Sequence, residues 1–307
     1  MRLTSIWALL GVVALASGQD ATAPPQPTVT LSAKAELLQD VLDRLQAQTH
    51  ILMVADPFTA ERRVTLEVNS APLGEALDAL AVAAVATWDA AYILTDGGPF
   101  GPQDQPAGWQ RPPQTRLTLS GGSGSAEKIT AALTNLSCAP VGYTPSLASL
   151  VVTTKPEQNA ALEDVLSSVQ GDHLTWARGF WFAPIDRAAV FGRYANLPPA
   201  EREQRVLRHV EQMLRLNKDD VRRALEARHR EVAGMTQAQR EAQIQHYADE
   251  IRAGVQVLNT LTGDVRDRAR DAMEIFFEIG LLVYRDLSED EQLEATPVIE
   301  AMGELQR

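Results

Sequence analysis

Two stretches of this 307-residue chain repeat one pattern of residues 88 positions apart. The string Val29–Ser32 matches Leu117–Ser120, and Thr87–Trp88 matches Thr175–Trp176. Between these anchors, the leucines of two helix-like patterns recur with slips of one to three residues. Spacing that is kept inside elements and slips between them is typical of a duplication with altered loops. The pattern therefore predicts an α+β fold that begins with two small related modules in tandem.

Each module is expected to have the element order βαββαβ, because period-2 and period-3.6 apolar patterns alternate along it. The first copy is predicted to contain, in chain order, strand Thr28–Leu31, helix Leu37–Leu45, strands Ile51–Val54 and Val64–Val68, helix Leu73–Leu80 and strand Trp88–Leu94. A module of roughly 68 residues is expected to bury one sheet face against two helices and little more.

The first copy, residues 28–95, resembles the short N-terminal domain of secretins and TonB-dependent proteins. The resemblance rests on the Asp56–Pro57 turn, the Val64–Leu66 strand and the helix Pro72–Leu80, which has the pattern Pro-Leu-x-x-Ala-Leu-x-x-Leu. It implies a module that contacts other proteins of the cell envelope. The second copy, residues 115–184, departs from the pattern, because Lys155–Asn159 replaces the Pro-Leu start and Gly121–Ser125 enlarges the first loop.

Residues 1–18 have the layout of a secretory signal peptide. Arg2 is followed by eleven apolar residues, Ile6–Ala16, and small residues precede a cleavage point before Gln19. The alternative, an uncleaved membrane anchor, is disfavoured because a membrane span needs about 20 apolar residues. No later stretch is apolar enough to span. We therefore expect a soluble periplasmic or secreted protein.

The composition changes twice after the first module. Residues 96–114 are rich in Pro and Gly and are interpreted as an extended linker. Residues 186–307 are dominated by charged, helix-forming residues with amphipathic spacing, which predicts an all-helical bundle or hairpin domain. Whether this domain also forms a groove for a partner is left open.

Several helix starts in this domain carry capping chemistry. Thr236–Gln239 and Ser288–Glu291 have capping-box spacing, Asn217 can cap a helix, and Pro199 suits a first turn. The string Met235–Gln239 also resembles the Leu-Thr-x-x-Gln pattern of small periplasmic stress proteins with chaperone-like activity. Capping alone is sufficient to explain the string.

The motifs that suggest chemistry are incomplete. Ser125 and Lys128 have the Ser-x-x-Lys spacing of some acyl-enzymes, but no further motif of that class is present, so Ser125 is interpreted as a helix cap. Glu274 and Glu278 are interpreted as a solvated face, and Cys138 as a buried thiol, with an intermolecular disulfide or a reactive thiol as alternatives. The five histidines, His50, His173, His209, His229 and His246, form no paired metal-ligand motif.

Three tryptophans, Trp88, Trp176 and Trp181, lie on the last strand of each module, where core packing is the first interpretation and peptide binding the alternative. We predict no catalytic, cofactor-binding or metal-binding residues and no cofactor. The net charge of −12 argues against nucleic acid and against anionic lipid as partners.

The leading hypothesis is a non-enzymatic exported protein that binds or scaffolds another protein of the cell envelope, such as a secretion-system accessory. A chaperone-like or stress-response protein is the alternative. Homo-oligomerisation is left open, as is the role of the helical domain as chaperone, dimerisation element or spacer.

Overall fold

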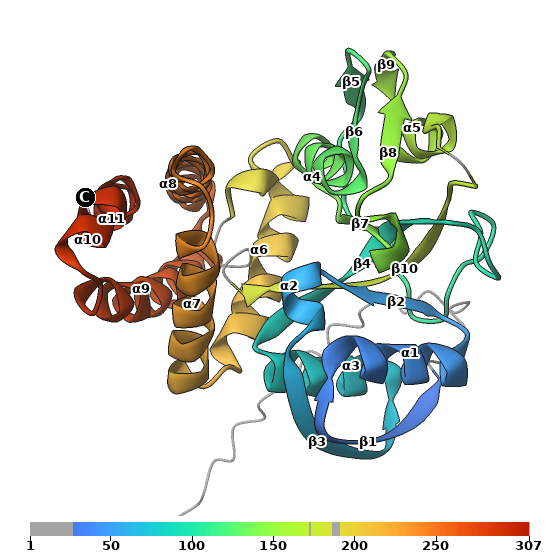
Figure 1. The fold of residues 1–307 in the computed structure, drawn as a ribbon, viewed down its shortest axis with the longest axis horizontal. Helices are drawn as coiled ribbons and strands as arrows, with labels where there is room; N and C mark the ends of the chain where they lie inside the picture. Colours follow the sequence, from blue (N-terminus) through green and yellow to red (C-terminus); the bar gives the residue numbers. More distant parts are fainter. Residues whose placement is uncertain (1–26, 172, 186–190, 307) are drawn as a thin grey trace, which may run out of the picture.

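The computed structural model describes residues 27–171, 173–185 and 191–306. The signal peptide predicted at residues 1–18 lies outside these ranges. The chain has mixed α/β architecture, with strands up to β10, and the described residues after β10 form helices and no strand (Figure 1). Among the described residues, no helix is long and apolar enough to cross a membrane.

The helices and strands predicted for the first module are all present. Most have longer bounds, the first strand by six residues, and the second strand is shifted by one residue, to Leu52–Ala55. They are β1 (Thr28–Leu37), α1 (Leu38–Thr49), β2 (Leu52–Ala55), a short α2 (Pro57–Ala60), β3 (Arg63–Pro72), α3 (Leu73–Ala84) and β4 (Ala86–Thr95). The apolar stripe Leu38, Leu42 and Leu45 of α1 is buried, and so is Leu77 of α3. Both helices lie between the β1–β3 ribbon and the central strands (Figure 1).

The following segment has a similar element order. It contains β5 (Leu117–Leu119), β6 (Gly122–Ser125), α4 (Ala126–Ser137), β7 (Val141–Tyr143), the 3₁₀ turn Pro145–Leu147, β8 (Val151–Thr154), β9 (Glu157–Ala160), α5 (Leu162–Ser168) and β10 (Thr175–Pro184). The two-stranded pairs β5–β9 and β6–β8 are antiparallel, as is the pair β1–β3.

The central sheet joins the two segments, with the strand order β2-β10-β4-β7. Strand β10 of the second segment pairs with β2 of the first, and β4 of the first pairs with β7 of the second, both in parallel. In the antiparallel pair β4–β10, Ala91 lies opposite Gly179, which is 88 residues further along the chain. The sequence led us to expect that each segment would complete a sheet of its own. Instead, the last strand of each segment pairs with a strand of the other, and one shared sheet results.

Residues 96–114 form no helix or strand, but they pack on this sheet instead of acting as a free spacer. Trp109 is buried edge-on against Tyr92, and its indole N–H donates to the Ala91 carbonyl at 3.2 Å. The Arg178 guanidinium lies 5.4 Å from the ring centres of both Trp109 and Trp176. These contacts fix the segment to the face of β4 and β10.

The C-terminal part is helical, as predicted. Its helices are α6 (Pro199–Leu214), α7 (Lys218–Ala233), α8 (Gln237–Thr260), α9 (Gly263–Arg285), α10 (Glu289–Glu294) and α11 (Thr296–Gly303), flanked by 3₁₀ turns at Gly192–Tyr194 and Glu304–Gln306. The predicted caps are confirmed: Thr236 and Ser288 begin capping boxes, Asn217 caps α7, and Pro199 lies in the first turn of α6.

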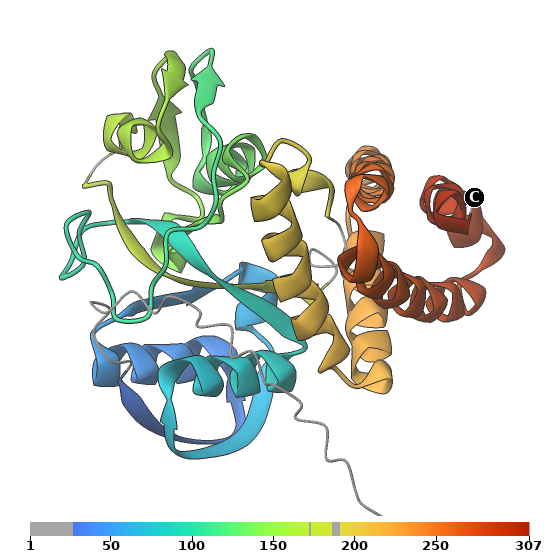
Figure 2. The same ribbon diagram turned by 180° about the vertical axis from the view of Figure 1, so that it is seen from behind.

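Two apolar cores divide the molecule into a sheet half, up to β10, and a helical half, from residue 191 onward. Helix α6 lies between the sheet half and helices α7 to α11 in both views (Figure 1 and Figure 2). Cys138, at the end of α4, contributes its buried free thiol to the core of the helical half. The interpretation of Cys138 as a buried thiol is therefore confirmed.

Candidate functional site

The residues that suggested chemistry in the sequence have structural roles or lie exposed on the surface. The Ser125 hydroxyl accepts a hydrogen bond from the Lys128 backbone N–H at 3.4 Å, so Ser125 caps α4 as expected. Glu274 pairs with Arg270 at 2.8 Å on the outer face of α9, and Glu278 is exposed. These residues do not converge on a common site.

The histidines and tryptophans are also dispersed or packed. Among residues 27–171, 173–185 and 191–306, no group of three or more His, Cys, Asp or Glu side chains is placed to hold a metal ion. Trp176 and Trp181 are buried in the sheet core, and Trp88 packs edge-on against Phe180 with ring centres 5.3 Å apart. The structure thus uses these aromatic residues for packing.

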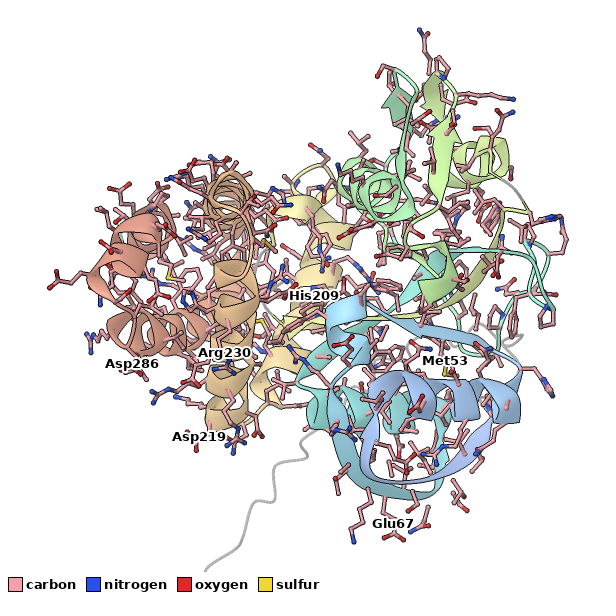
Figure 3. The ribbon with its side chains drawn as sticks, in the orientation of Figure 1. Met53, Glu67, His209, Asp219, Arg230 and Asp286 are labelled. Carbon is pink, nitrogen blue, oxygen red and sulfur yellow. The ribbon has the colours of Figure 1, made fainter. Side chains whose placement is uncertain are left out.

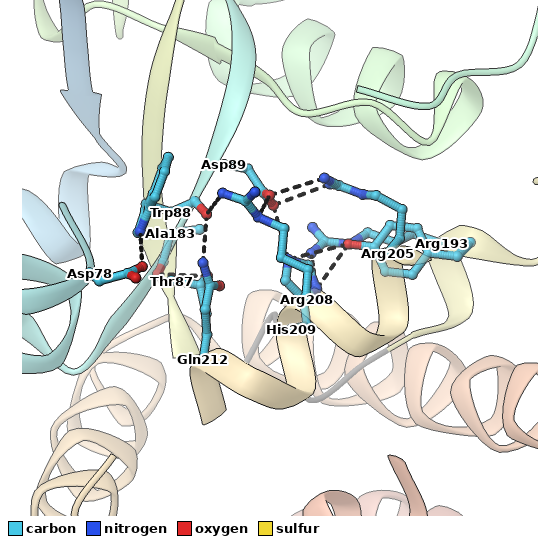
Figure 4. A network of polar contacts seen from close by, with 11 residues as sticks. Asp78, Thr87, Trp88, Asp89, Ala183, Arg193, Arg205, Arg208, His209 and Gln212 are labelled. Atoms are coloured by element: carbon cyan, nitrogen blue, oxygen red, sulfur yellow. Dashed lines mark hydrogen bonds and ion pairs between the residues drawn. The ribbon is translucent and has the colours of Figure 1, made fainter. Parts of the chain in front are cut away.

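The sequence interpretation missed a buried polar network between the two halves, centred on Asp89 of β4 (Figure 4). Arg205 of α6 forms a bidentate pair with Asp89, with N–O distances of 3.0 and 3.2 Å. Arg208 forms an ion pair with the same carboxylate at 3.0 Å, and His209 Nε2 lies 2.9 Å from Asp89 Oδ2. On its other side, His209 Nδ1 lies 2.9 Å from the hydroxyl of Tyr194.

Burial and charge together determine the protonation states in this network. Burial alone would raise the pKa of Asp89, but the positive charge of Arg205 and the hydrogen bond from His209 outweigh it and hold the pKa far below its ordinary range. Burial lowers the pKa of His209 to about 4, although the negative charge of Asp89 opposes this shift. At neutral pH, His209 is therefore neutral, donates from Nε2 to Asp89 and accepts at Nδ1 from the Tyr194 hydroxyl.

The network is a structural joint, by which we mean the set of buried contacts that connects β4 of the sheet half to α6 of the helical half. Its acid–base groups, Asp89 and His209, are closed to solvent. Asp89 is 6% exposed and His209 is 0% exposed, so a substrate would reach neither group without separating the two halves. Figure 3 shows His209 in the interior, whereas the exposed residues Glu67, Asp219 and Asp286 lie at the periphery. The Gln212 side chain adds a hydrogen bond to the Trp88 carbonyl at 2.9 Å.

A signal for this joint was present in the sequence. Arg205, Arg208, His209 and Gln212 are spaced i, i+3, i+4, i+7, which places them on one face of α6. Asp89 is the acidic residue of an otherwise apolar and aromatic strand pattern. A polar stripe at core spacing and an acid in a buried strand each need a partner, because buried charges are rarely unpaired.

A half-open groove with a volume of about 510 Å³ lies in the helical half. We define the groove by its wall residues, which recur at helical spacing on four helices: Leu225, Arg228, His229 and Val232 on α7; Arg240, Gln243, Ile244 and Tyr247 on α8; Phe276, Gly280, Val283, Tyr284 and Leu287 on and after α9; and Ala295, Val298, Ile299 and Met302 on and before α11. Asp290, Glu291 and Glu294 of α10 also line it. Most of these walls are apolar, which suits a binding site of this size.

Polar contacts border the groove on the side of α10. His229 of α7 contacts Glu291 at 3.1 Å, and Arg240 of α8 contacts Glu294 through two N–O distances of 3.1 and 3.2 Å. Hydrogen bonds from the Ser288 side chain and backbone, and then from His229, lower the pKa of Glu291 to about 2, so it is ionised at any physiological pH. The acidic face of α10 is therefore held against α7 and α8.

Comparisons of the chain with protein families, with curated proteins and with solved structures find no match. The likeness of residues 28–95 to the short N-terminal domain of secretins and TonB-dependent proteins stays a prediction from the motif.

Proposed function

We propose that the protein is a non-enzymatic, exported binding or scaffold protein whose groove receives a segment of another envelope protein. The observation that carries this proposal is the groove itself: four helices direct stripes of side chains into one half-open space, and the stripes are apolar on α9 and α11 and mixed with Arg, His and Gln on α7 and α8. Apolar surface exposed to water in such a concave site is stabilised when a partner covers it.

The architecture supports a scaffold role. The buried pairs between Asp89 and α6 attach the helical half to a sheet that is itself built from two interlocked segments. A partner bound in the groove would thus be held in a defined orientation to the sheet half. The proposed export rests on the signal-like residues 1–18, and the proposed envelope setting rests on the motif likeness of residues 28–95.

We further propose that the two segments of the sheet half are copies of one module. Besides the register of Ala91 with Gly179, their tryptophan contacts correspond. The Trp88 indole N–H donates to Asp78 of α3 at 2.8 Å, and the Trp176 indole N–H donates to Ser167 of α5 at 3.1 Å. This correspondence matches the one-residue slip seen between the two sequence patterns.

The binding role can be tested by crosslinking in living cells that export the full chain. A photo-crosslinking amino acid at Val232, on the half-buried groove wall, is expected to give a small number of discrete products identifiable by mass spectrometry. The same amino acid at Leu136, which is 45% exposed on α4, is the matched control and is expected to give none of them. Identical products from both positions, or no product from Val232, would contradict the proposal.

A chaperone-like function is the second candidate, because a half-open apolar groove can also hold unfolded segments transiently. The full chain would then suppress aggregation of a reduced, unfolding protein at less than equimolar ratio, and Gly280→Leu would abolish the effect by filling the groove. No suppression by the wild-type chain would leave the scaffold role and remove this candidate.

A further inference from the structure

We infer that the occupant of the groove is an amphipathic α-helix of a partner protein, with basic residues beside its apolar stripe. This inference rests on the proposed function and specifies the chemistry of the partner. It follows from the spacing of the wall residues, from the open side of the groove and from the unbalanced charge on α10.

The spacing of the wall residues is that of a helix bundle with one position empty. On α8 and on the stretch that ends in α11, the wall residues are spaced i, i+3, i+4, i+7, which is the spacing of a helix face packed on another helix. On and just after α9 the wall runs from Phe276 to Leu287, eleven steps along the chain or about 16 Å at 1.5 Å per residue. The complement of the apolar stripes on α9 and α11, flanked by the mixed stripes on α7 and α8, is the apolar stripe of a further amphipathic helix about three turns long.

The size of the groove determines how such a helix would lie. A volume of about 510 Å³ is too small to enclose three turns of helix with all side chains, whose diameter is about 10–12 Å. The groove is half-open, so a helix can lie along the opening and insert one face. Gly280 leaves α9 without a side chain at the floor, where an added Cβ would lie 3.2 Å from Met302 Cε.

The charge around the opening favours a basic partner. Among the described residues, Glu294 of α10 pairs with Arg240 and Glu291 contacts the His229 imidazole, whereas Glu289 and Asp290 are exposed and form no ion pair. Asp290 lines the groove. The cations on the opposite walls are already matched, since Arg228 pairs with Glu231 and Arg240 with Glu294. The charge left for a ligand is therefore negative, and a helix with Lys or Arg beside its apolar face complements it.

The experiment compares three fluorescein-labelled 14-residue probes by fluorescence anisotropy with the full chain. The first has Leu at i, i+3, i+4, i+7 and i+11 and Lys at most other positions; the second replaces each Lys with Glu; and the third has the composition of the first in an order without a helical stripe. We expect the Lys probe to bind at least tenfold more tightly than either of the others, and its affinity to fall with added salt.

Variants of the protein locate the binding. Gly280→Leu is expected to weaken the Lys probe at least tenfold, whereas Gly303→Leu, at a helical glycine whose added Cβ meets no atom within 4 Å, is expected to leave it unchanged. Ile244→Gln, on the half-buried wall, provides the same test without placing bulk at the floor. Asp290→Lys is expected to reduce the preference for Lys over Glu probes.

The inference would be overturned by equal or tighter binding of the Glu probe, or by binding of the Lys probe that Gly280→Leu and Ile244→Gln both leave intact. Displacement of the Lys probe by micromolar dodecanoate, which would indicate an acyl-chain site, would overturn it too. A dimer in sedimentation experiments that Gly280→Leu dissociates would identify a second copy as the occupant and would also overturn it. If photo-crosslinking at Val232 gives discrete products but the Lys probe does not bind, the proposed function stands and only the helical, basic nature of the partner is rejected.

Discussion

Asp89 accepts contacts from three side chains of one helix, Arg205, Arg208 and His209, inside the boundary between the two halves. The net contribution of a buried ion pair to stability is modest, because desolvation offsets most of the attraction. Removing one partner is different, since it leaves the other charges buried and unmatched. The network therefore specifies how the halves are oriented more than it adds to the stability of the fold.

The first prediction concerns Asp89→Asn. The amide cannot neutralise Arg205, so we expect the free energy of unfolding to fall by about 3–5 kcal/mol. Urea unfolding followed by circular dichroism measures the change. Asp96→Asn, at an exposed position just after β4, is the control and should change stability by less than about 0.5 kcal/mol. Equal effects of the two substitutions would show that the Asp89 network is not a stabilising joint.

The second prediction concerns pH. The pKa of His209 is about 4 in the folded chain and 6.5 ordinarily, so the unfolded state binds more protons between these values. Stability is therefore expected to be full above pH 6.5 and to decrease as the pH falls toward 4, by up to about 3 kcal/mol. The depressed pKa of Asp89 adds a further loss at lower pH, as its carboxylate becomes protonated.

The groups facing His209 are Asp89 from β4, Arg193 and Tyr194 from the 3₁₀ turn, and Arg205 from the same helix. Unfolding free energies measured at pH 7.5, 6.5, 5.5 and 4.5 test the prediction against His209→Gln, which should lose most of the slope between pH 6.5 and 4.5. A slope that His209→Gln retains would assign the pH dependence to other groups.

Among the secondary-structure elements, β7 depends on a close approach by β10 of the same segment. A Cβ at Gly142 would overlap the indole ring of Trp181, which comes from β10. Only glycine leaves room for this contact, and the ring of Trp181 also lies 6.0 Å from that of Tyr143. The third prediction is that Gly142→Ala lowers the free energy of unfolding by about 1–3 kcal/mol, the usual cost of overpacking.

Gly122→Ala is the matched control, because Gly122 is also in a strand of the second segment and its added Cβ meets no atom within 4 Å. We expect it to be neutral or slightly stabilising. Thermal unfolding of both variants distinguishes the cases. Equal melting temperatures would show that the contact between Trp181 and β7 does not constrain the sheet.

The location of most of these elements could be predicted from the sequence, whereas their partners could not. The strand patterns at Val64–Val68 and Trp88–Leu94 and the capped helix starts at Asn217 and Thr236 correspond to observed elements. Those signals arise between residues a few positions apart. The exchange of β4 and β10 carries no such signal, because an apolar strand pattern specifies a buried strand and not its neighbour.

In the molecule as a whole, the two cores meet at α6, so the halves are expected to unfold together. The fourth prediction uses the distribution of tryptophan: the four described tryptophans, Trp88, Trp109, Trp176 and Trp181, all lie in the sheet half, whereas helices dominate the other half. Tryptophan fluorescence and circular dichroism at 222 nm should therefore give coincident urea transitions in the wild-type chain. Asp89→Asn is expected to separate the two midpoints, and separate midpoints already in the wild type would indicate two independent domains.

The sequence by itself determined the local structure: the order of helices and strands, the capped helix starts, the buried thiol at the end of α4 and the division into a sheet half and a helical half. These features depend on residues close together in the chain. Only the tertiary structure decided which strands pair, that Asp89 meets His209 from 120 positions away, and that four helices leave a groove between them. Strand partners, buried ion pairs and grooves result from contacts between distant residues, and many partners satisfy the same local apolar pattern.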